Sequence, residues 1–209
     1  MRPESAAQIH KTRIAVLVSG GGTNLQALLD AEAAGRLGAG KIVLVVSNRA
    51  DSYALTRAAK AGVESLALPG SDPDFETKLS AVLHARGIEM IVLAGFLRIL
   101  SGDFTSAWPE RIINIHPSLI PAFCGEGFYG LRVHEAVLAA EVSITGATVH
   151  YVNEIPDGGR IILQKLVAVR SGDTPEILQQ RVMRDAEWVI LPQAAELVAE
   201  KIAEKRENQ

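Results

Sequence analysis

The chain has 209 residues, of which 21 are Lys or Arg and 24 are Asp or Glu, so its formal net charge is −3. The apolar share of 48% is ordinary for a globular domain and excludes disorder as the main state, which requires low hydrophobicity and high net charge. The mildly acidic balance argues against nucleic acid as the main partner, and no apolar run approaches the roughly 18 residues of a membrane-spanning helix. We therefore expect a folded protein without a nucleic-acid or membrane partner.

The N-terminal segment, residues 1–12, is polar and lacks the apolar centre of a secretory signal. We expect it to be a flexible tail, followed by a single domain over residues 13–209. The only cysteine, Cys124, excludes an intrachain disulfide and fits a reducing compartment, so we expect a cytoplasmic protein.

The first 116 residues alternate short apolar runs with helical stretches. Strands are predicted at 13–18, 41–46, 63–68, 89–94 and 111–116, and helices at 24–35, 52–61 and 74–86. Strands that are apolar on both faces and alternate with helices indicate a parallel sheet covered on both sides. A ligand crevice is expected at the carboxyl ends of these strands.

The last third of the chain changes character. Residues 146–153 and 160–169 are two extended runs around a turn-rich segment, which predicts an antiparallel strand pair. A helical stretch follows from about Thr174 to Glu204, and Pro192 predicts an interruption in it. The predicted fold class is α/β, a mostly parallel, doubly wound sheet with an antiparallel C-terminal strand pair and a long C-terminal helix.

The first predicted strand ends in the glycine loop Ser19-Gly-Gly-Gly-Thr-Asn24, and a helix follows. Such a loop brings backbone N–H groups and the positive end of the helix to one point, which binds phosphate. The dinucleotide fingerprint fails because Leu25 replaces its third glycine, and the P-loop ending Gly-Lys-Ser/Thr is missing. The remaining interpretations are a short cradle for a phosphate monoester, with Thr23 and Asn24 as side-chain donors, or a tight structural turn.

Asn114 and His116 lie two residues apart at the end of the last predicted parallel strand. Because strand side chains alternate, both point to the same face. They also lie at the carboxyl end of the strand, where an α/β sheet places its ligands. An amide donor beside an imidazole suits a developing oxyanion, and a histidine exchanges protons near neutral pH. A buried, hydrogen-bonded pair that closes the strand is the structural alternative.

Asp157 lies in Pro156-Asp-Gly-Gly159, which is also a common turn sequence between antiparallel strands. The functional interpretation is a carboxylate held close to His116, where it favours the imidazolium form and relays protons.

Other polar residues carry less weight. His150 and Thr148 share one face of their strand and either line the crevice or pack in the core. His134 is expected on a helix surface or in a loop, and Cys124 is expected to be a small hydrophobe rather than a nucleophile. The five histidines show no metal-binding spacing, so we expect no metal site.

Five segments together resemble the phosphoribosylglycinamide formyltransferase family, folate-dependent enzymes of purine synthesis. The resemblance covers about residues 13–195 and is carried by Ser19–Ala27, Leu93–Leu100, Asn114–Pro121, Gly146–His150 and Asp157–Gly159. The Asn-x-His-Pro-Ser-Leu block is shared with other formyl-folate enzymes, whereas the glycine loop points to the phosphoribosyl amine. The resemblance implies formyl transfer from 10-formyltetrahydrofolate, as co-substrate, to that amine, without a metal, in a monomer or homodimer.

The same resemblance assigns site residues. It implies that the acceptor phosphate binds at Gly22, Thr23 and Asn24 and that Glu187 contacts the ribose. It implies that the folate is bound by Leu97, Arg98, Ile99, Leu100, Asn114, Asn153 and Asp157. It gives the catalytic roles to Asn114, His116 and Asp157. In one departure, Asp72 stands where the family often has a basic residue that contacts the folate tail. The loop Cys124–Gly130 is also longer than in some relatives.

Three other functions are compatible with parts of the sequence. A formyltetrahydrofolate hydrolase would use the same three residues with water as acceptor, but it would not need the phosphate cradle, and we expect no preceding regulatory domain. A non-catalytic domain that binds a phosphorylated metabolite explains the glycine loop and leaves Asn114 and His116 unexplained. A hydrolase that uses Cys124 as its nucleophile is the most remote alternative.

Overall fold

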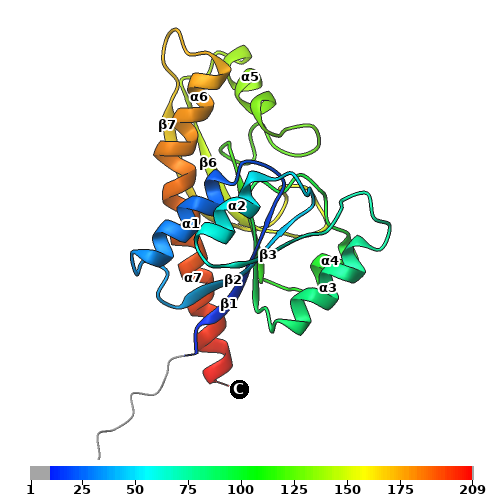
Figure 1. Ribbon diagram of the computed structural model, residues 1–209. Coiled ribbons are helices and arrows are strands. Elements are labelled where there is room, and N and C mark those ends of the chain that lie inside the picture. Colours follow the sequence, from blue (N-terminus) through cyan, green and yellow to red (C-terminus); the bar gives the residue numbers. More distant parts are fainter. Residues whose placement is uncertain (1–9, 209) are drawn as a thin grey trace, which may run out of the picture.

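The computed structural model describes residues 10–208 (Figure 1). Within them seven strands form one sheet in the order β3-β2-β1-β4-β5-β6-β7. The strands are β1 (Thr12–Val18), β2 (Gly40–Ser47), β3 (Glu64–Ala67), β4 (Met90–Leu93), β5 (Ile112–His116), β6 (Ile144–Tyr151) and β7 (Ile161–Ala168). The first five strands pair in parallel, and β6 and β7 join the sheet in antiparallel pairing. The predicted α/β fold class is confirmed.

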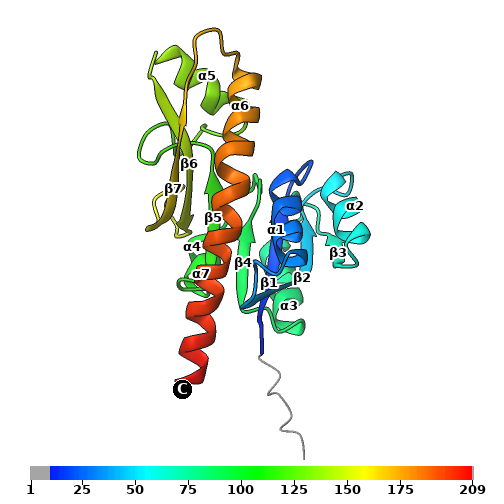
Figure 2. The same cartoon turned by 90° about the vertical axis from the view of Figure 1, so that its left-hand side faces the viewer.

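Helices cover both faces of the sheet (Figures 1 and 2). They are α1 (Thr23–Ala33), α2 (Tyr53–Lys60), α3 (Phe75–Ala85), α4 (Gly102–Ser106), α5 (Leu131–Ala139), α6 (Pro175–Val182) and α7 (Trp188–Glu207), with a π-helical turn, η1 (Met183–Glu187), between the last two. Residues that alternate along β1 enter different cores, because Val16 packs with α1 and α7 whereas Leu17 packs with α3 and α4. This double burial explains why the central parallel strands β1, β2 and β4 carry apolar residues on both faces.

The boundaries of most elements lie within one or two residues of the predicted ones. β1 begins at Thr12, the last residue of the segment expected to be a tail, and residues 1–9 of that segment lie outside the described range. Thr12 is buried, and its hydroxyl donates to the carbonyl of Ala199 in α7 at 2.9 Å. The start of the sheet is thereby fastened to the C-terminal helix.

The interruption predicted at Pro192 is wrong. The irregularity lies earlier, at η1, and α7 continues through a buried Pro192. A proline inside a helix removes one backbone N–H donor without having to end the helix, and the π-helical turn lies before it. The sequence shows the missing donor but gives no sign of the π-helical turn.

The described helices include none with the length and apolar character needed to cross a membrane.

Candidate active site

A cavity of about 720 Å³ opens at the carboxyl ends of the central parallel strands. Three loops line it, at residues 95–100 after β4, 125–130 before α5 and 153–157 after β6, and α5 and η1 close its remaining side. Ser19 holds the first loop to the end of β1, because its hydroxyl accepts the N–H of Leu97 at 2.9 Å. The cavity therefore lies where an open α/β sheet is expected to bind its ligands.

Two neighbouring strands supply the polar groups at the centre of this cavity. The pairing of β5 with β6 sets Asn114 opposite His150 and His116 opposite Thr148. Asn114 is half-buried and His116 is buried, and both line the cavity with His150. Thr148 does not line the cavity, and its hydroxyl donates to the carbonyl of Ser118 at 2.7 Å.

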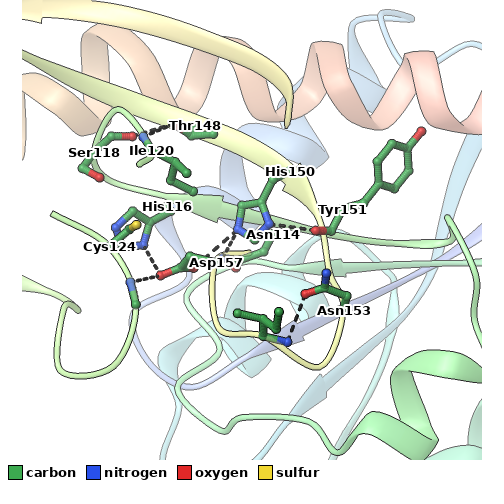
Figure 3. Close-up of polar contacts among 12 residues, drawn as sticks. Asn114, His116, Ser118, Ile120, Cys124, Thr148, His150, Tyr151, Asn153 and Asp157 are labelled. Carbon is green, nitrogen blue, oxygen red and sulfur yellow. Dashed lines mark hydrogen bonds and ion pairs between the residues drawn. The ribbon is translucent and has the colours of Figure 1, made fainter. Parts of the chain in front are cut away.

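Asp157 lies between the two histidines (Figure 3). One carboxylate oxygen is 3.3 Å from Nδ1 of His116, and the other is 3.4 Å from Nε2 of His150. The Nδ2 atom of Asn114 is 3.2 Å from the same Nε2 atom. The structure thus brings Asn114, His116 and Asp157 into one cluster and adds His150 to it.

The outer nitrogens of both rings contact backbone carbonyls. His116 Nε2 is 2.9 Å from the carbonyl oxygen of Phe123, and His150 Nδ1 is 2.8 Å from that of Tyr151. Because a carbonyl only accepts, each of these nitrogens carries a proton. In its neutral form each ring therefore turns a lone pair toward Asp157, so an added proton is held between a ring and the carboxylate.

Burial and charge act in opposite directions on this cluster. Burial lowers the pKa of His116 below its usual value, and the Asp157 carboxylate opposes this without overcoming it. Burial also raises the pKa of Asp157, but the hydrogen bond to His150, the charge of His116 and the N–H of Gly125 outweigh it, so the pKa lies below its usual value. Asp157 acts on His116 in the direction predicted from the sequence, but desolvation is the larger influence on the ring.

The turn that carries Asp157 has a constrained backbone. Asp157 has a φ of 55°, and the N–H of Gly158 closes the turn on the carbonyl of Ile155 at 2.9 Å. A Cβ atom at Gly159 would lie 1.7 Å from the carbonyl oxygen of Tyr151, so glycine is required there. The Asp-Gly-Gly sequence forms a turn, as its composition predicts, and the same turn aims the carboxylate at the histidines.

The loop at residues 122–130 is fastened to the cluster by its backbone. The carbonyl of Phe123 accepts from His116, and the N–H of Gly125 donates to Asp157 Oδ2 at 2.9 Å. Between them, the thiol of Cys124 donates to the carbonyl of Pro121 at 3.3 Å, and burial raises the pKa of that thiol. A raised pKa disfavours the thiolate, which argues against a nucleophilic role for Cys124.

The glycine loop lies beside the cavity, at the start of α1. Gly22 has a φ of 71° and stands directly before Thr23, the first residue of the helix. Asn24 is buried and lines the cavity, and its Nδ2 donates to Glu187 Oε2 at 2.6 Å. Thr23 instead borders a neighbouring pocket of about 290 Å³, and its hydroxyl faces the sulfur of Met183 at 3.9 Å.

Glu187 is a buried carboxyl group at the end of η1. Burial raises its pKa to about 7, and the hydrogen bond from Asn24 opposes the rise. The side chain is therefore poised between its neutral and charged forms near neutral pH, next to the glycine loop.

The loop after β4 presents apolar side chains to solvent. Leu97 and Ile99 are 63% and 66% exposed, and Leu97, Arg98, Ile99 and Leu100 all line the cavity, as does Asn153 on the opposite side. The guanidinium group of Arg98 lies 4.6 Å from the centre of the Phe75 ring and donates to the carbonyl of Gly70. Asp72 forms an ion pair with Lys78, which lowers the pKa of the Asp72 carboxyl.

The expectation that His134 lies on a helix surface or in a loop is wrong. His134 is fully buried in α5, lines the cavity, and has no hydrogen-bond partner for either ring nitrogen within residues 10–208. Burial lowers its pKa to about 4, and the charge of His116 adds to the effect. The signal was present, because Leu131 and Leu138 lie three residues before and four after His134 and place it on the apolar stripe of the helix.

Comparisons with known proteins agree on one family. A family model described as formyl transferase matches residues 12–195. The trifunctional purine biosynthetic protein adenosine-3 of Gallus gallus is 44% identical over 196 residues, which cover 92% of this chain and 19% of the relative. The chloroplastic phosphoribosylglycinamide formyltransferase of Arabidopsis thaliana is 36% identical over 203 residues, which cover 95% of this chain and 69% of the relative.

A solved structure is similarly close. The crystal structure of glycinamide ribonucleotide transformylase 1 from Symbiobacterium toebii has a TM-score of 0.85 at 44% identity, covering 93% of this chain and 90% of that chain. The chain spans only about a fifth of the length of the trifunctional relatives that it matches.

Proposed function

The chain belongs to the formyl transferase family, and we propose that it transfers the formyl group of 10-formyltetrahydrofolate to the amine of N1-(5-phosphoribosyl)glycinamide. The observation that carries this proposal is the position of Asn114, His116 and Asp157 in a single cavity that reaches from Asn24 and Glu187 to residues 97–100. The names of the relatives supply the identity of the acceptor.

The two substrates bind at opposite ends of this cavity. The acceptor phosphate binds at the backbone of Gly22, Thr23 and Asn24, and its ribose contacts Glu187. The folate pterin binds against the backbone of residues 97–100 and the segment Asn153–Asp157, and the exposed side chains of Leu97 and Ile99 cover it. The formyl carbon then lies beside Asn114 and His116.

The reaction begins when the neutral amine attacks the formyl carbon. A carbon–nitrogen bond forms, and the electrons of the formyl carbonyl move to its oxygen. The Asn114 amide donates to this oxyanion, and loss of one such donor costs about 3 kcal/mol in other enzymes. The positive charge of the protonated His116 ring stabilises the oxyanion from close by, because both ring nitrogens already contact the protein. Because burial disfavours the imidazolium in the free protein, the arriving negative charge and Asp157 together favour the protonated ring.

The intermediate collapses when the bond between the formyl carbon and folate N10 breaks. One proton leaves the amine and one proton reaches N10, so the products are formylglycinamide ribonucleotide and tetrahydrofolate. Asp157 holds a proton against His116 or His150 while this transfer takes place. No metal ion takes part in this proposal, and we place the enzyme in the cytoplasm.

The test combines the protein with 10-formyltetrahydrofolate in the presence and absence of phosphoribosylglycinamide, and the products are weighed. The expected result is a formylated acceptor, with tetrahydrofolate formed only when the acceptor is present. Deformylation at the same rate without the acceptor would establish a formyltetrahydrofolate hydrolase instead. Binding of both compounds without turnover would identify a non-catalytic binding domain.

A further inference from the structure

The two peptide carbonyls at the centre of the glycine loop point toward α2 and its first residues. The carbonyl of Gly20 accepts from the Ser52 hydroxyl at 2.7 Å and from the N–H of Ala54 at 3.2 Å. The carbonyl of Gly21 accepts from Nε of Arg57 at 2.8 Å. All three donors come from Ser52, the residue before α2, or from α2 itself.

This arrangement fixes the direction of the N–H groups. In a trans peptide the carbonyl and the N–H that follows it point in opposite directions. Holding the carbonyls of Gly20 and Gly21 toward α2 therefore turns the N–H groups of Gly21 and Gly22 away from it. Neither N–H donates to another group within residues 10–208, and both precede the positive end of α1.

Arg57 is itself held in place by both helices. Its Nη1 donates to Oε1 of Gln26 in α1 at 3.0 Å, and its guanidinium lies 5.1 Å from the centre of the Tyr53 ring in α2. The helix packs so closely behind the loop that a Cβ at Gly22 would lie 2.6 Å from Cβ of Ala54. A guanidinium fixed at this many points can set the orientation of a peptide group.

We propose that Arg57, assisted by Ser52, is a positioning residue for the acceptor phosphate. It acts through the carbonyl of Gly21, which orients the N–H groups that bind the phosphate, and it touches neither the phosphate nor the reacting atoms. This inference rests on the proposed function for the identity of the acceptor. It adds a second helix, α2, to the phosphate site and explains why a loop without a lysine recognises an anion.

The experiment compares Arg57→Met with Lys60→Met, which removes the same charge at the end of the same helix without touching the glycine loop. Each variant is assayed with the phosphorylated acceptor and with the acceptor that lacks its 5′-phosphate. Arg57→Met is expected to raise KM for the phosphorylated acceptor by about tenfold, which corresponds to the loss of one good hydrogen bond to a charged group. KM for the folate should stay within about twofold of the wild-type value. The preference for the phosphorylated acceptor over the acceptor without its phosphate should fall by the same factor by which KM for the phosphorylated acceptor rises.

Two further variants keep the test decisive. Arg57→Lys retains the charge and one donor, so it is expected to restore part of the preference and to fold even where Arg57→Met does not. Ser52→Ala removes one of the two bonds to Gly20 and is expected to have a smaller effect of the same kind. An unchanged preference in a folded Arg57→Met or Arg57→Lys protein would overturn the proposal, and so would an equal loss in Lys60→Met.

Inorganic phosphate separates this inference from the proposed function. Phosphate that binds the loop raises the midpoint of thermal unfolding, whatever reaction the enzyme catalyses. If wild-type protein is stabilised by phosphate and Arg57→Met is not, the positioning role stands even if formyl transfer is not observed. If phosphate stabilises both proteins equally, Arg57 does not orient the loop.

Discussion

The glycine loop beside the cavity and the polar cluster at the cavity's centre are built on different principles, and we call them the backbone end and the side-chain end of the site. In our proposal the glycine loop binds its ligand through backbone N–H groups, and hydrogen bonds from α2 and from Ser52 hold the carbonyls behind them. Between β5 and β6 the polar groups are side chains, and each of the two histidine rings lies within 3.4 Å of the Asp157 carboxylate. A backbone site keeps its charge state at every pH, whereas a side-chain cluster can gain and lose protons.

The difference matches the demands on each end. Recognition of a phosphate requires donors that stay fixed while the substrate binds. Transfer of a formyl group requires groups whose proton affinity changes as charge develops. Variants at the two ends should therefore fail in different ways, and the following experiments test this separation from the largest expected effect to the smallest.

The largest effect is expected at the side-chain end. Asn114→Ala and Asp157→Asn should each lower kcat by about 10²- to 10³-fold, because each removes a group that stabilises charge in the transition state. KM for the phosphorylated acceptor should change far less, since the glycine loop is untouched. Steady-state kinetics with both substrates measures this, and Asp51→Asn, at an exposed ion pair, is the control. Near-full activity in either variant would remove that residue from the mechanism.

Glu187 is the titratable group at the backbone end, and its pH dependence sharpens the comparison. Burial raises its pKa to about 7. Below about pH 4.5 the neutral carboxyl group costs the folded protein no stability, and the free energy of unfolding falls as the pH rises through 7. Glu187→Gln removes this loss, so the variant should exceed wild type in free energy of unfolding by on the order of 3 kcal/mol at pH 8. Urea denaturation at pH 5 and pH 8 measures the difference. An equal gap at both pH values would show that the pKa of Glu187 is the same in the folded and unfolded protein and that burial does not raise it.

Gly22 tests whether the backbone end is as rigid as its hydrogen bonds imply. Gly22→Ala introduces a Cβ at 2.6 Å from Ala54 and places alanine at a φ of 71°, so it should cost about 2 kcal/mol of stability. It should also raise KM for the phosphorylated acceptor with little change in kcat. Gly20→Ala is the matched control, because no atom lies within 4 Å of a Cβ at that position. If both substitutions weaken acceptor binding equally, the steric explanation fails.

The smallest effect concerns His134, beneath the side-chain end. Its pKa is lowered from 6.5 to about 4, so its contribution to stability is present above about pH 6.5 and is lost as the pH falls toward 4. His134→Leu cannot take up a proton and should lose less stability over this range, by roughly 2 kcal/mol once partial solvent screening is allowed for. Thermal unfolding between pH 4 and pH 7 measures it, with His84→Leu, at an exposed histidine, as control. Parallel pH profiles for wild type and His134→Leu would contradict the assignment.

The fold was largely predictable because its signals are local. β1, β2 and β4 each contain an uninterrupted apolar run, and the turn residues at Pro156–Gly159 predict the antiparallel pair. The two-residue period of a strand was enough to predict that Asn114 and His116 point to the same face. The contact of Asp157 with His116 and His150 was not predictable in this way. It depends on the turn after β6 and on the positive φ of Asp157 within that turn.

Other features of the site had no local signal. The contacts of Ser52 and Arg57 with the glycine loop join residues more than 30 positions apart, and nothing in the helix pattern of α2 distinguishes them from surface residues. The opposing effects of burial and charge on His116 also depend on the packed structure, because desolvation is a property of the surroundings rather than of the residue.

The π-helical turn constrains how the C-terminal segment can change in length. Glu187, at its end, reaches Asn24, while Ile190, Ala194 and Val198 beyond it pack against the sheet. Deleting one residue from this turn would restore a regular α-helix and rotate one part against the other by about 100°. The carboxyl group or the apolar stripe would then face the wrong way, so a length change there disrupts either the contact of Glu187 with Asn24 or the packing of the core.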